Sequence, residues 1–241
     1  MKIEEIQRAL REGGVDGWLF YDHHHRDPIA GRVLGLDAEA LVTRRWYYLV
    51  PAEGECRKLV HRIESGRLDG LAGRRAVYSS WQELEGGLRA MVAPYRRLAM
   101  QYSARNANMY VSMVDAGTVE LLREWGKEIV SSADLVARFE AVLSAEQIAS
   151  HYRAQRLVDE ILAEGFREVG RRVRGVVGGP ASGFTEWDMV VWFREALGRA
   201  GLVWEHGPNV SVGSNSSDSH YEAAASGSRA IRDGDFLLVD I

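Results

Sequence analysis

The spacing of apolar residues changes repeatedly along the chain, and each change predicts a switch between helix and strand. Ile3, Ile6 and Leu10 recur at helical spacing, so the chain begins with an amphipathic helix. Residues 17–21 (GWLFY) then form a short apolar run that is typical of a strand. The sequence therefore predicts a fold that opens with a helix followed by a strand.

A second strand signal consists of two apolar runs with a turn between them. Residues 46–50 (WYYLV) and residues 58–61 (KLVH) both favour strands, and Pro51 and Gly54 lie between them. Proline and glycine are typical turn residues, so we expect the two runs to pair as an antiparallel hairpin.

Three polar motifs mark the expected beginnings of later helices. In each motif a Ser or Thr is followed three residues later by Glu, Gln or Asp, a spacing that lets the two residues cap the first turn of a helix. The motifs lie at residues 80–83, 144–147 and 185–188. The helical pattern that begins at Ser144 and continues to Val169 is the longest in the chain.

The chain between the first two motifs alternates in the same way. Apolar runs predict strands at residues 98–102 and 128–130, and helical spacing predicts helices at residues 119–125 and 135–142. Strands that alternate with helices of this length imply an α/β layer architecture.

The start of the longest helical pattern divides the chain into two predicted domains, residues 1–143 and 144–241. No linker rich in proline, glycine or serine separates them. The glycine-rich stretch at residues 175–183 lacks the Lys-Ser/Thr ending of a phosphate-binding P-loop, and we interpret it as a plain loop.

Composition narrows the possible functions. The chain has 241 residues, of which 46% are hydrophobic and 27% charged, enough for one large or two ordinary globular domains. The formal net charge is −4 and the arginines are dispersed, so we expect neither nucleic acid nor a membrane surface as a partner. The single cysteine, Cys56, and the absence of an apolar signal segment in residues 2–12 favour a cytoplasmic location.

Three consecutive histidines, His23, His24 and His25, follow the first predicted strand. Successive side chains of an extended segment point in different directions, so the three imidazoles cannot converge on one metal ion. We interpret this segment as a polar loop or as a contact with a neighbouring subunit.

His220 and Asp240 are the strongest candidates for chemistry. His220 follows a turn-rich loop, and Asp240 lies at the end of an apolar run at residues 236–241 (FLLVDI) that predicts a buried strand. A carboxylate in such a place is costly to bury unless it is hydrogen-bonded, paired or bound to a cation. Asp240 is therefore a candidate metal ligand, and an exposed aspartate at a strand end is the alternative.

Segments throughout the chain resemble the Xaa-Pro peptidases, the aminopeptidase P and prolidase family of creatinase-like metallopeptidases. Two of these segments resemble the creatinase-like N-terminal domain, and three resemble the first half of the pita-bread catalytic domain. In that order they are GWLFYDHHHRDPIAGRVLGL at residues 17–36, MQYSARNANMYVSMVDAGTVELL at 100–122, SAEQIASHYRAQRLVDEI at 144–161, GPNVSVGSNSSDSHYEA at 207–223 and GDFLLVDI at 234–241. The resemblance implies an α/β N-terminal domain at residues 1–143 and a partial α+β catalytic domain at residues 144–241.

The resemblance also implies roles for the two candidate residues. It makes His220 the histidine that contacts substrate and helps to stabilise the tetrahedral intermediate, and Asp240 the first aspartate of a dinuclear metal site. In this family two divalent ions, commonly manganese and sometimes cobalt or zinc, share a hydroxide that attacks the scissile carbonyl. The substrates are proline-containing peptides or dipeptides, cut between the N-terminal residue and proline, and the enzymes are usually dimers.

The family's other metal ligands lie downstream of Asp240, and the sequence ends at Ile241. Those ligands are a second aspartate, a histidine and two glutamates. One carboxylate and one histidine that is not a ligand cannot hold two ions, so we expect this chain to be truncated within the catalytic domain and inactive alone.

Two other interpretations stay open. In the first, the chain is a non-catalytic interaction or regulatory protein, or an oligomerising fragment. Half a catalytic domain would leave the apolar face of its sheet uncovered, and such a face favours a partner or self-association. The other is a metal-free, creatinase-like amidinohydrolase. Asp240 argues against the latter, since the metal-free members lose ligand carboxylates.

Overall fold

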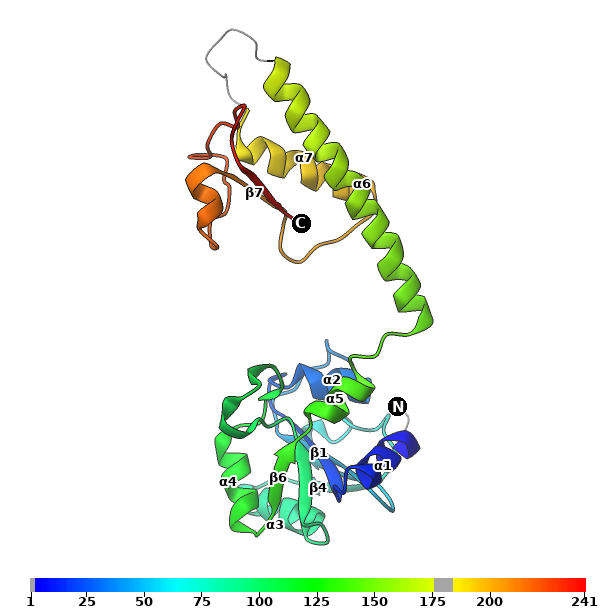
Figure 1. Cartoon of the computed structure of the whole chain (residues 1–241). Coiled ribbons are helices and arrows are strands. Elements are labelled where there is room, and N and C mark those ends of the chain that lie inside the picture. The colour runs from blue at the N-terminus through cyan, green and yellow to red at the C-terminus, as the bar shows by residue number, and fades with distance from the viewer. Residues whose placement is uncertain (1–2, 176–183) are drawn as a thin grey trace. The chain divides into compact units, whose positions relative to one another are not determined.

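A computed structural model describes residues 3–175 and 184–241 and divides the chain into two compact units, Met1–Val142 and Leu143–Ile241 (Figure 1). The first is called the N-terminal unit and the second the C-terminal unit. Apart from Gly175, the glycine-rich stretch predicted to be a loop lies outside the described residues. None of the described helices is long and apolar enough to cross a membrane.

The N-terminal unit is built on a mixed six-stranded sheet with the strand order β4-β3-β2-β1-β5-β6. The strands are β1 (Gly17–Asp22), β2 (Trp46–Pro51), β3 (Arg57–His61), β4 (Arg74–Tyr78), β5 (Arg97–Met100) and β6 (Glu128–Ser131). Strand β2 is antiparallel to both β1 and β3, which confirms the predicted hairpin. The pairs β3–β4, β1–β5 and β5–β6 are parallel.

Helices cover both faces of this sheet. They are α1 (Ile3–Glu12), α2 (Pro28–Leu34), α3 (Trp81–Val92), α4 (Ala116–Glu124) and α5 (Ala133–Phe139), with short 3-10 turns at Arg62–Glu64, Ala104–Asn106 and Met109–Val111. Helices α1, α2 and α5 pack on the face that carries Trp18 and Phe20, whereas α3 and α4 pack on the face that carries Leu19 and Tyr21. Successive residues of a strand point to opposite faces, so β1 is buried on both sides in a three-layer arrangement.

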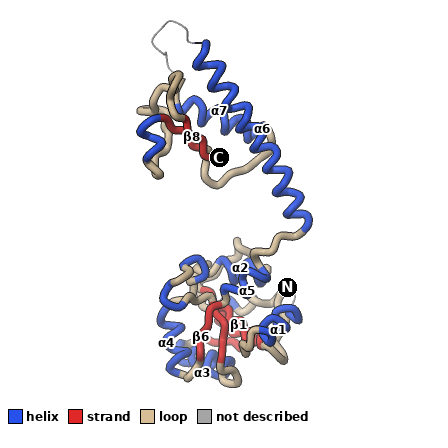
Figure 2. The backbone as a smooth tube through the Cα atoms, in the orientation of Figure 1, coloured by secondary structure: helices blue, strands red, loops and turns tan. Residues whose placement is uncertain are grey.

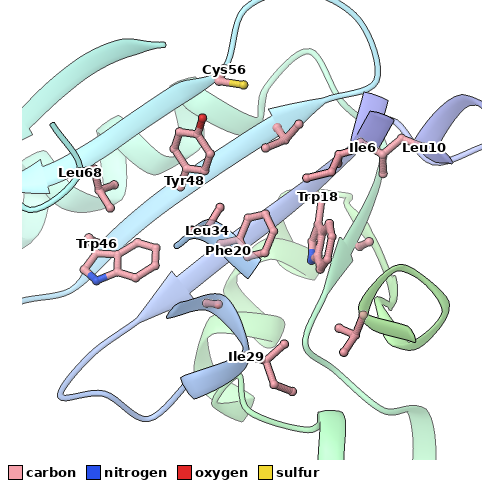
Figure 3. Packing of buried hydrophobic residues seen from close by; sticks show 14 of the residues in the cluster. Ile6, Leu10, Trp18, Phe20, Ile29, Leu34, Trp46, Tyr48, Cys56 and Leu68 are labelled. Atoms are coloured by element: carbon pink, nitrogen blue, oxygen red, sulfur yellow. The ribbon is translucent and has the colours of Figure 1, made fainter. Parts of the chain in front are cut away.

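An aromatic cluster fills the first of these two faces (Figure 3). The rings of Trp18 and Phe20 lie 4.3 Å apart between centroids. Two polar atoms of the cluster have partners: Trp18 Nε1 donates to Gln101 Oε1 at 3.1 Å, and the Tyr48 hydroxyl donates to the Ala72 carbonyl at 2.9 Å. Large aromatic side chains are thus buried without leaving these polar groups unsatisfied.

The C-terminal unit packs two helices and a small sheet around its own core (Figure 2). Its elements are α6 (Ala145–Gly175), α7 (Glu186–Arg199), β7 (Asn209–Val212), the 3-10 turn Gly213–Ser217 and β8 (Leu237–Asp240). Strands β7 and β8 pair antiparallel. Helices α6 and α7 approach closely at Gly165, where an added Cβ atom would lie 2.3 Å from Phe193 Cζ.

Two predictions about this chain are wrong in detail. The helix predicted through residues 135–142 ends at Phe139, and Val142 is exposed. The last strand is shorter than predicted and is not fully buried, because Phe236 is exposed and Asp240 is exposed at its end. Among the described residues β8 pairs only with β7, and only one of its faces packs against the core.

Candidate functional site

The antiparallel pair β7–β8 is the scaffold of the candidate site. Its register places Asn209 opposite Asp240 and Val212 opposite Leu237. Leu237 and Val239 pack against the core of the unit. Asp240 therefore points to the opposite face of the two-stranded sheet, since alternate residues of a strand face opposite sides.

The side-chain amide of Asn209 connects the two candidate residues through the backbone. Its Nδ2 donates to the Tyr221 carbonyl at 2.7 Å, and its Oδ1 accepts from the Ala223 amide at 3.1 Å. Asn209 thus ties the segment that follows His220 to the end of the sheet that carries Asp240. The structure brings the two chain segments together at one place.

His220 itself lies in an exposed turn after the 3-10 turn Gly213–Ser217. Its backbone amide donates to Asp218 Oδ1 at 3.0 Å, and the amide of Asp218 donates to the Asn215 carbonyl at 3.2 Å. Within the described part of the chain, no hydrogen bond or ion pair joins the His220 imidazole to the Asp240 carboxylate. The turn fixes the backbone of His220 and leaves its side chain facing outward.

A buried carboxylate, that of Glu186, organises the loop that carries His220. Glu186 is the first residue of α7 and is 0% exposed. Its oxygens accept from the backbone amides of Val212 and Arg229, both at 2.8 Å, from Asn215 Nδ2 at 3.0 and 3.1 Å, and from the Tyr221 hydroxyl at 2.5 Å. The donors are the last residue of β7 and three residues spread along the segment between β7 and β8, so one carboxylate contacts this loop at several places.

These hydrogen bonds keep Glu186 ionised. Burial raises the pKa of Glu186, but the hydrogen bonds from Tyr221, Arg229, Val212 and Asn215 outweigh burial and hold the pKa below its ordinary value. Burial, and then the hydrogen bond to Glu186, raise the pKa of the Tyr221 hydroxyl. The hydroxyl therefore stays protonated and continues to donate.

The sequence around Glu186 explains why the carboxylate lies there. Thr185 and Asp188 form the predicted capping box at the start of α7, with Asp188 Oδ2 accepting from the Thr185 amide at 2.8 Å. The amide of Glu186 donates to the Arg229 carbonyl at 3.0 Å, and Thr185 forms an isolated bridge with Ala230. The helix start is thus attached to the loop, and a negative charge in the first turn is favoured by the helix dipole.

The residues present do not fit a dinuclear metal centre. No group of three or more His, Cys, Asp or Glu side chains within residues 3–175 and 184–241 converges as a metal site would require. Asp240 is the one predicted ligand, and it lies opposite an asparagine rather than a second acid. A pair of ions needs several carboxylate or imidazole donors around it.

Glu186 was missed from the sequence because its local signal is ordinary. Acidic residues are common in the first turn of a helix, so a glutamate beside a capping box indicates only a helix start. Its donors at Val212 and Arg229 lie 26 and 43 residues away along the chain. Only the folded structure shows that they converge on one carboxylate.

Comparison of the sequence with known proteins gives no match to a family model and no match to a curated protein. Comparison of the structure does give matches. The prolidase from Thermococcus sibiricus is 14% identical with a TM-score of 0.57, over 99% of this chain and 60% of that chain. The dipeptidase from Pyrococcus horikoshii OT3 is 18% identical with a TM-score of 0.58, over 100% and 60%. The Xaa-Pro dipeptidase from Bacillus anthracis is 14% identical with a TM-score of 0.58, over 99% and 59%.

The likeness at this level of identity concerns the fold. It extends over nearly all of this chain, which spans about 60% of the length of those solved structures. The predicted α/β fold class is confirmed by the mixed sheet and by these similarities. The chain therefore has the fold of prolidases and Xaa-Pro dipeptidases over about three fifths of their length.

Proposed function

We propose that this chain is part of an Xaa-Pro peptidase, a hydrolase that cuts proline-containing peptides or dipeptides after their N-terminal residue. The observation that carries the proposal is the shared fold with prolidases and Xaa-Pro dipeptidases over 99% of the chain. The N-terminal unit is then the creatinase-like domain, residues 1–143, and the C-terminal unit is a partial pita-bread catalytic domain, residues 144–241. A cytoplasmic homodimer is the expected form.

Within this proposal His220 is the substrate-side histidine. Its imidazole faces outward from a turn whose backbone is held by Asp218, and the loop around it is held by Glu186. An imidazole so placed is able to donate a hydrogen bond to an oxygen on which charge develops. Asp240 is the first metal-ligating carboxylate, at the strand end next to this loop.

The same proposal makes the 241 residues inactive alone. Divalent ions, with manganese expected and cobalt or zinc as alternatives, would supply an activated hydroxide in a complete site. Asp240 is one of several carboxylates that such a site needs, and the described residues provide no further cluster beside it. The remaining ligands must then come from polypeptide outside these residues.

A longer polypeptide tests the proposal. The coding sequence beyond Ile241 is read, and the extended protein is assayed on an Xaa-Pro dipeptide with manganese. We expect hydrolysis that falls about 10²- to 10³-fold in kcat in the His220→Ala variant, the loss seen when one transition-state donor is removed. His206→Ala is the matched control, an exposed histidine of the same unit, and should change kcat less than twofold. An equal loss of kcat in the two variants, or no hydrolysis by the unmutated extended protein, contradicts the proposal.

A second candidate function is a non-catalytic interaction protein. The observation that favours it is the exposure of apolar side chains around the small sheet, where Phe236 and Ile241 are 68% and 41% exposed. An apolar surface of this kind favours a partner chain or self-association. Light scattering that shows a monomer at high concentration would count against this alternative, and a stop codon directly after Ile241 would favour it.

A further inference from the structure

The N-terminal unit has a pocket that the proposed function does not use. It is an open depression of about 510 Å³ at the edge of the six-stranded sheet where β1, β3 and β4 end. Tyr21, His61 and Tyr78 line it from those three strands, and Arg45 lines it from the residue before β2. Strand β2 is antiparallel to β1, so its beginning lies at the same edge. The carboxyl ends of strands are where open α/β sheets commonly bind ligands.

The pocket carries an excess of positive charge. Arg26, Arg44 and Arg45 line it, and Asp115 is the single acidic residue of the lining. The Glu64 carboxylate lies next to the lining, accepting from the backbone amides of Thr43 and Arg44, so positive charge is in excess by at least one. Within the described residues none of the three guanidinium groups is within salt-bridge distance of a carboxylate. Arginines that are not paired with carboxylates in a concave site are available to bind an anion.

Within the described residues Asp115 forms no ion pair with these arginines, because its carboxylate is hydrogen-bonded elsewhere. Its carboxylate caps α4, accepting from the Thr118 amide at 2.9 Å and from the Thr118 hydroxyl at 2.8 Å. Burial raises the pKa of Asp115, but the hydrogen bonds from Thr118 and Tyr21 outweigh it and hold the pKa below its ordinary value. The carboxylate therefore stays ionised and hydrogen-bonded to the first turn of α4.

The positive charges of Arg26 and Arg45 both affect His23, so the two guanidinium groups lie in the same region of the pocket. Burial, and then the charges of His24, Arg26 and Arg45, lower the pKa of His23, which lines the same pocket. His23 is thus favoured in its neutral form, and the two guanidinium groups remain the local cations. They lie near the two ends of the connection between β1 and β2, Arg26 after β1 and Arg45 directly before β2.

An aromatic surface lies next to the charged groups. Trp81, the first residue of α3, lines the pocket and is 66% exposed. Tyr78 and Leu84 lie beside it in the lining and are buried. An exposed indole at a cationic pocket offers a flat apolar surface on which a ring of a ligand can stack.

We propose that this pocket binds a small organic dianion with an aromatic or other flat group, of the class of the phosphate monoesters. Arg26, Arg44 and Arg45 hold the charged end, and Trp81 stacks on the flat end. A dianion is favoured over a monocarboxylate because three guanidinium groups line the pocket, and the planar guanidinium fork fits phosphate oxygens. All of these residues lie in the N-terminal unit, so the site does not depend on the peptidase proposal.

Calorimetric titration of the full chain at low salt tests the site, with phenyl phosphate as the probe. We expect phenyl phosphate to bind at least about tenfold more tightly than phenyl sulfate, which has the same ring and one negative charge less. Inorganic phosphate, which lacks the ring, should bind several-fold more weakly than phenyl phosphate. Equal affinities for phenyl phosphate and phenyl sulfate, or no binding of phenyl phosphate at millimolar concentration, would overturn the proposal.

Two variants and a matched control locate the binding. Arg26→Gln with Arg45→Gln should weaken phenyl phosphate binding at least about tenfold, because two charge-assisted contacts are lost. Arg153→Gln with Arg156→Gln removes the same charge from exposed positions of α6 and should change affinity less than twofold. Trp81→Ala should lower the affinity for phenyl phosphate to that for inorganic phosphate. Equal weakening by both arginine pairs contradicts the assignment.

Discussion

The sheets of the two units differ in how their strands are buried. All six residues of β1 in the N-terminal unit are buried, whereas in β8 of the C-terminal unit Leu237, Leu238 and Val239 are half-buried and Asp240 is exposed. The first sheet is covered by helices on both faces, and the second packs against its core on one face. Apolar burial is therefore sufficient to stabilise the sheet of the N-terminal unit. The loop between β7 and β8 in the C-terminal unit needs other interactions to hold its conformation.

Glu186 supplies that order through hydrogen bonds. A buried carboxylate is costly unless its oxygens are satisfied, and here five donor contacts satisfy them. In the N-terminal core, by contrast, the polar atoms are single groups on large apolar side chains, such as the Trp18 indole nitrogen, which is hydrogen-bonded within an apolar cluster. The candidate site thus depends on one charged side chain, whereas the N-terminal fold depends on many apolar ones.

The largest expected effect sharpens this contrast in the N-terminal unit. Trp18→Ala should destabilise the unit by about 4 kcal/mol, because it removes a fully buried ring and leaves a cavity. Trp204→Ala in the C-terminal unit, where the ring is 41% exposed, is the control and should cost about 1 kcal/mol or less. Hydrogen exchange of the β1 amides measures the first effect. Unchanged protection of β1 in Trp18→Ala would contradict the account of that core.

Glu186→Ala should have the next largest effect. Its loss leaves the buried amide of Val212, the partly buried amide of Arg229 and the side chain of Asn215 without their acceptor, which should cost about 3 kcal/mol. Glu195→Ala, on the exposed surface of the same helix, is the control and should cost less than about 0.5 kcal/mol. Urea unfolding measures both variants, and equal costs would show that Glu186 does not organise the loop.

The contact between α6 and α7 gives a smaller effect. Gly165→Ala should cost about 2 kcal/mol, because the new Cβ atom would lie 2.3 Å from Phe193 Cζ and force the helices apart. Gly198→Ala meets nothing within 4 Å and should be neutral or stabilise α7 by up to about 1 kcal/mol, as alanine does in helices. Thermal unfolding compares the two variants. A Gly165→Ala protein as stable as Gly198→Ala would mean that the helices do not pack this closely.

The smallest expected effect is a dependence of stability on pH. The pKa of Glu186 is lower in the folded than in the unfolded chain, so its contribution to stability is complete above the unfolded value, about 4.3, and is lost as the pH falls through the folded value. Between the two values stability rises with pH. Glu186→Gln should lack this contribution. Identical acid unfolding curves for the parent and Glu186→Gln would show that the Glu186 carboxylate does not contribute to the pH dependence of stability.

Much of the N-terminal fold is predictable because its signals are local. The Pro51 and Gly54 turn predicts the β2–β3 hairpin, and the Ser80 capping box predicts α3, both as observed. Strand β4 escapes prediction because four of its five residues are exposed and it begins with Arg74 and Arg75, so it has no apolar pattern. Helix α2 escapes because it has only seven residues and contains Pro28 and Gly31.

The candidate site is less predictable because its contacts are not local. His220 and Asp240 stood out by residue type and resemblance, and their roles remain predictions. The link between their segments through Asn209 depends on strand register, and the burial of Glu186 depends on a loop that closes over it. Strand register and loop closure follow from the packing of the whole unit, which apolar spacing alone does not reveal.

The most direct measurement is an assay of the purified 241-residue chain on an Xaa-Pro dipeptide with added manganese. We expect no hydrolysis above the uncatalysed rate, because the described residues hold no cluster of three or more candidate metal ligands. The Asp240→Asn variant is assayed in parallel and should give the same result. Hydrolysis that is proportional to the concentration of the chain, and is abolished in Asp240→Asn, would contradict the account.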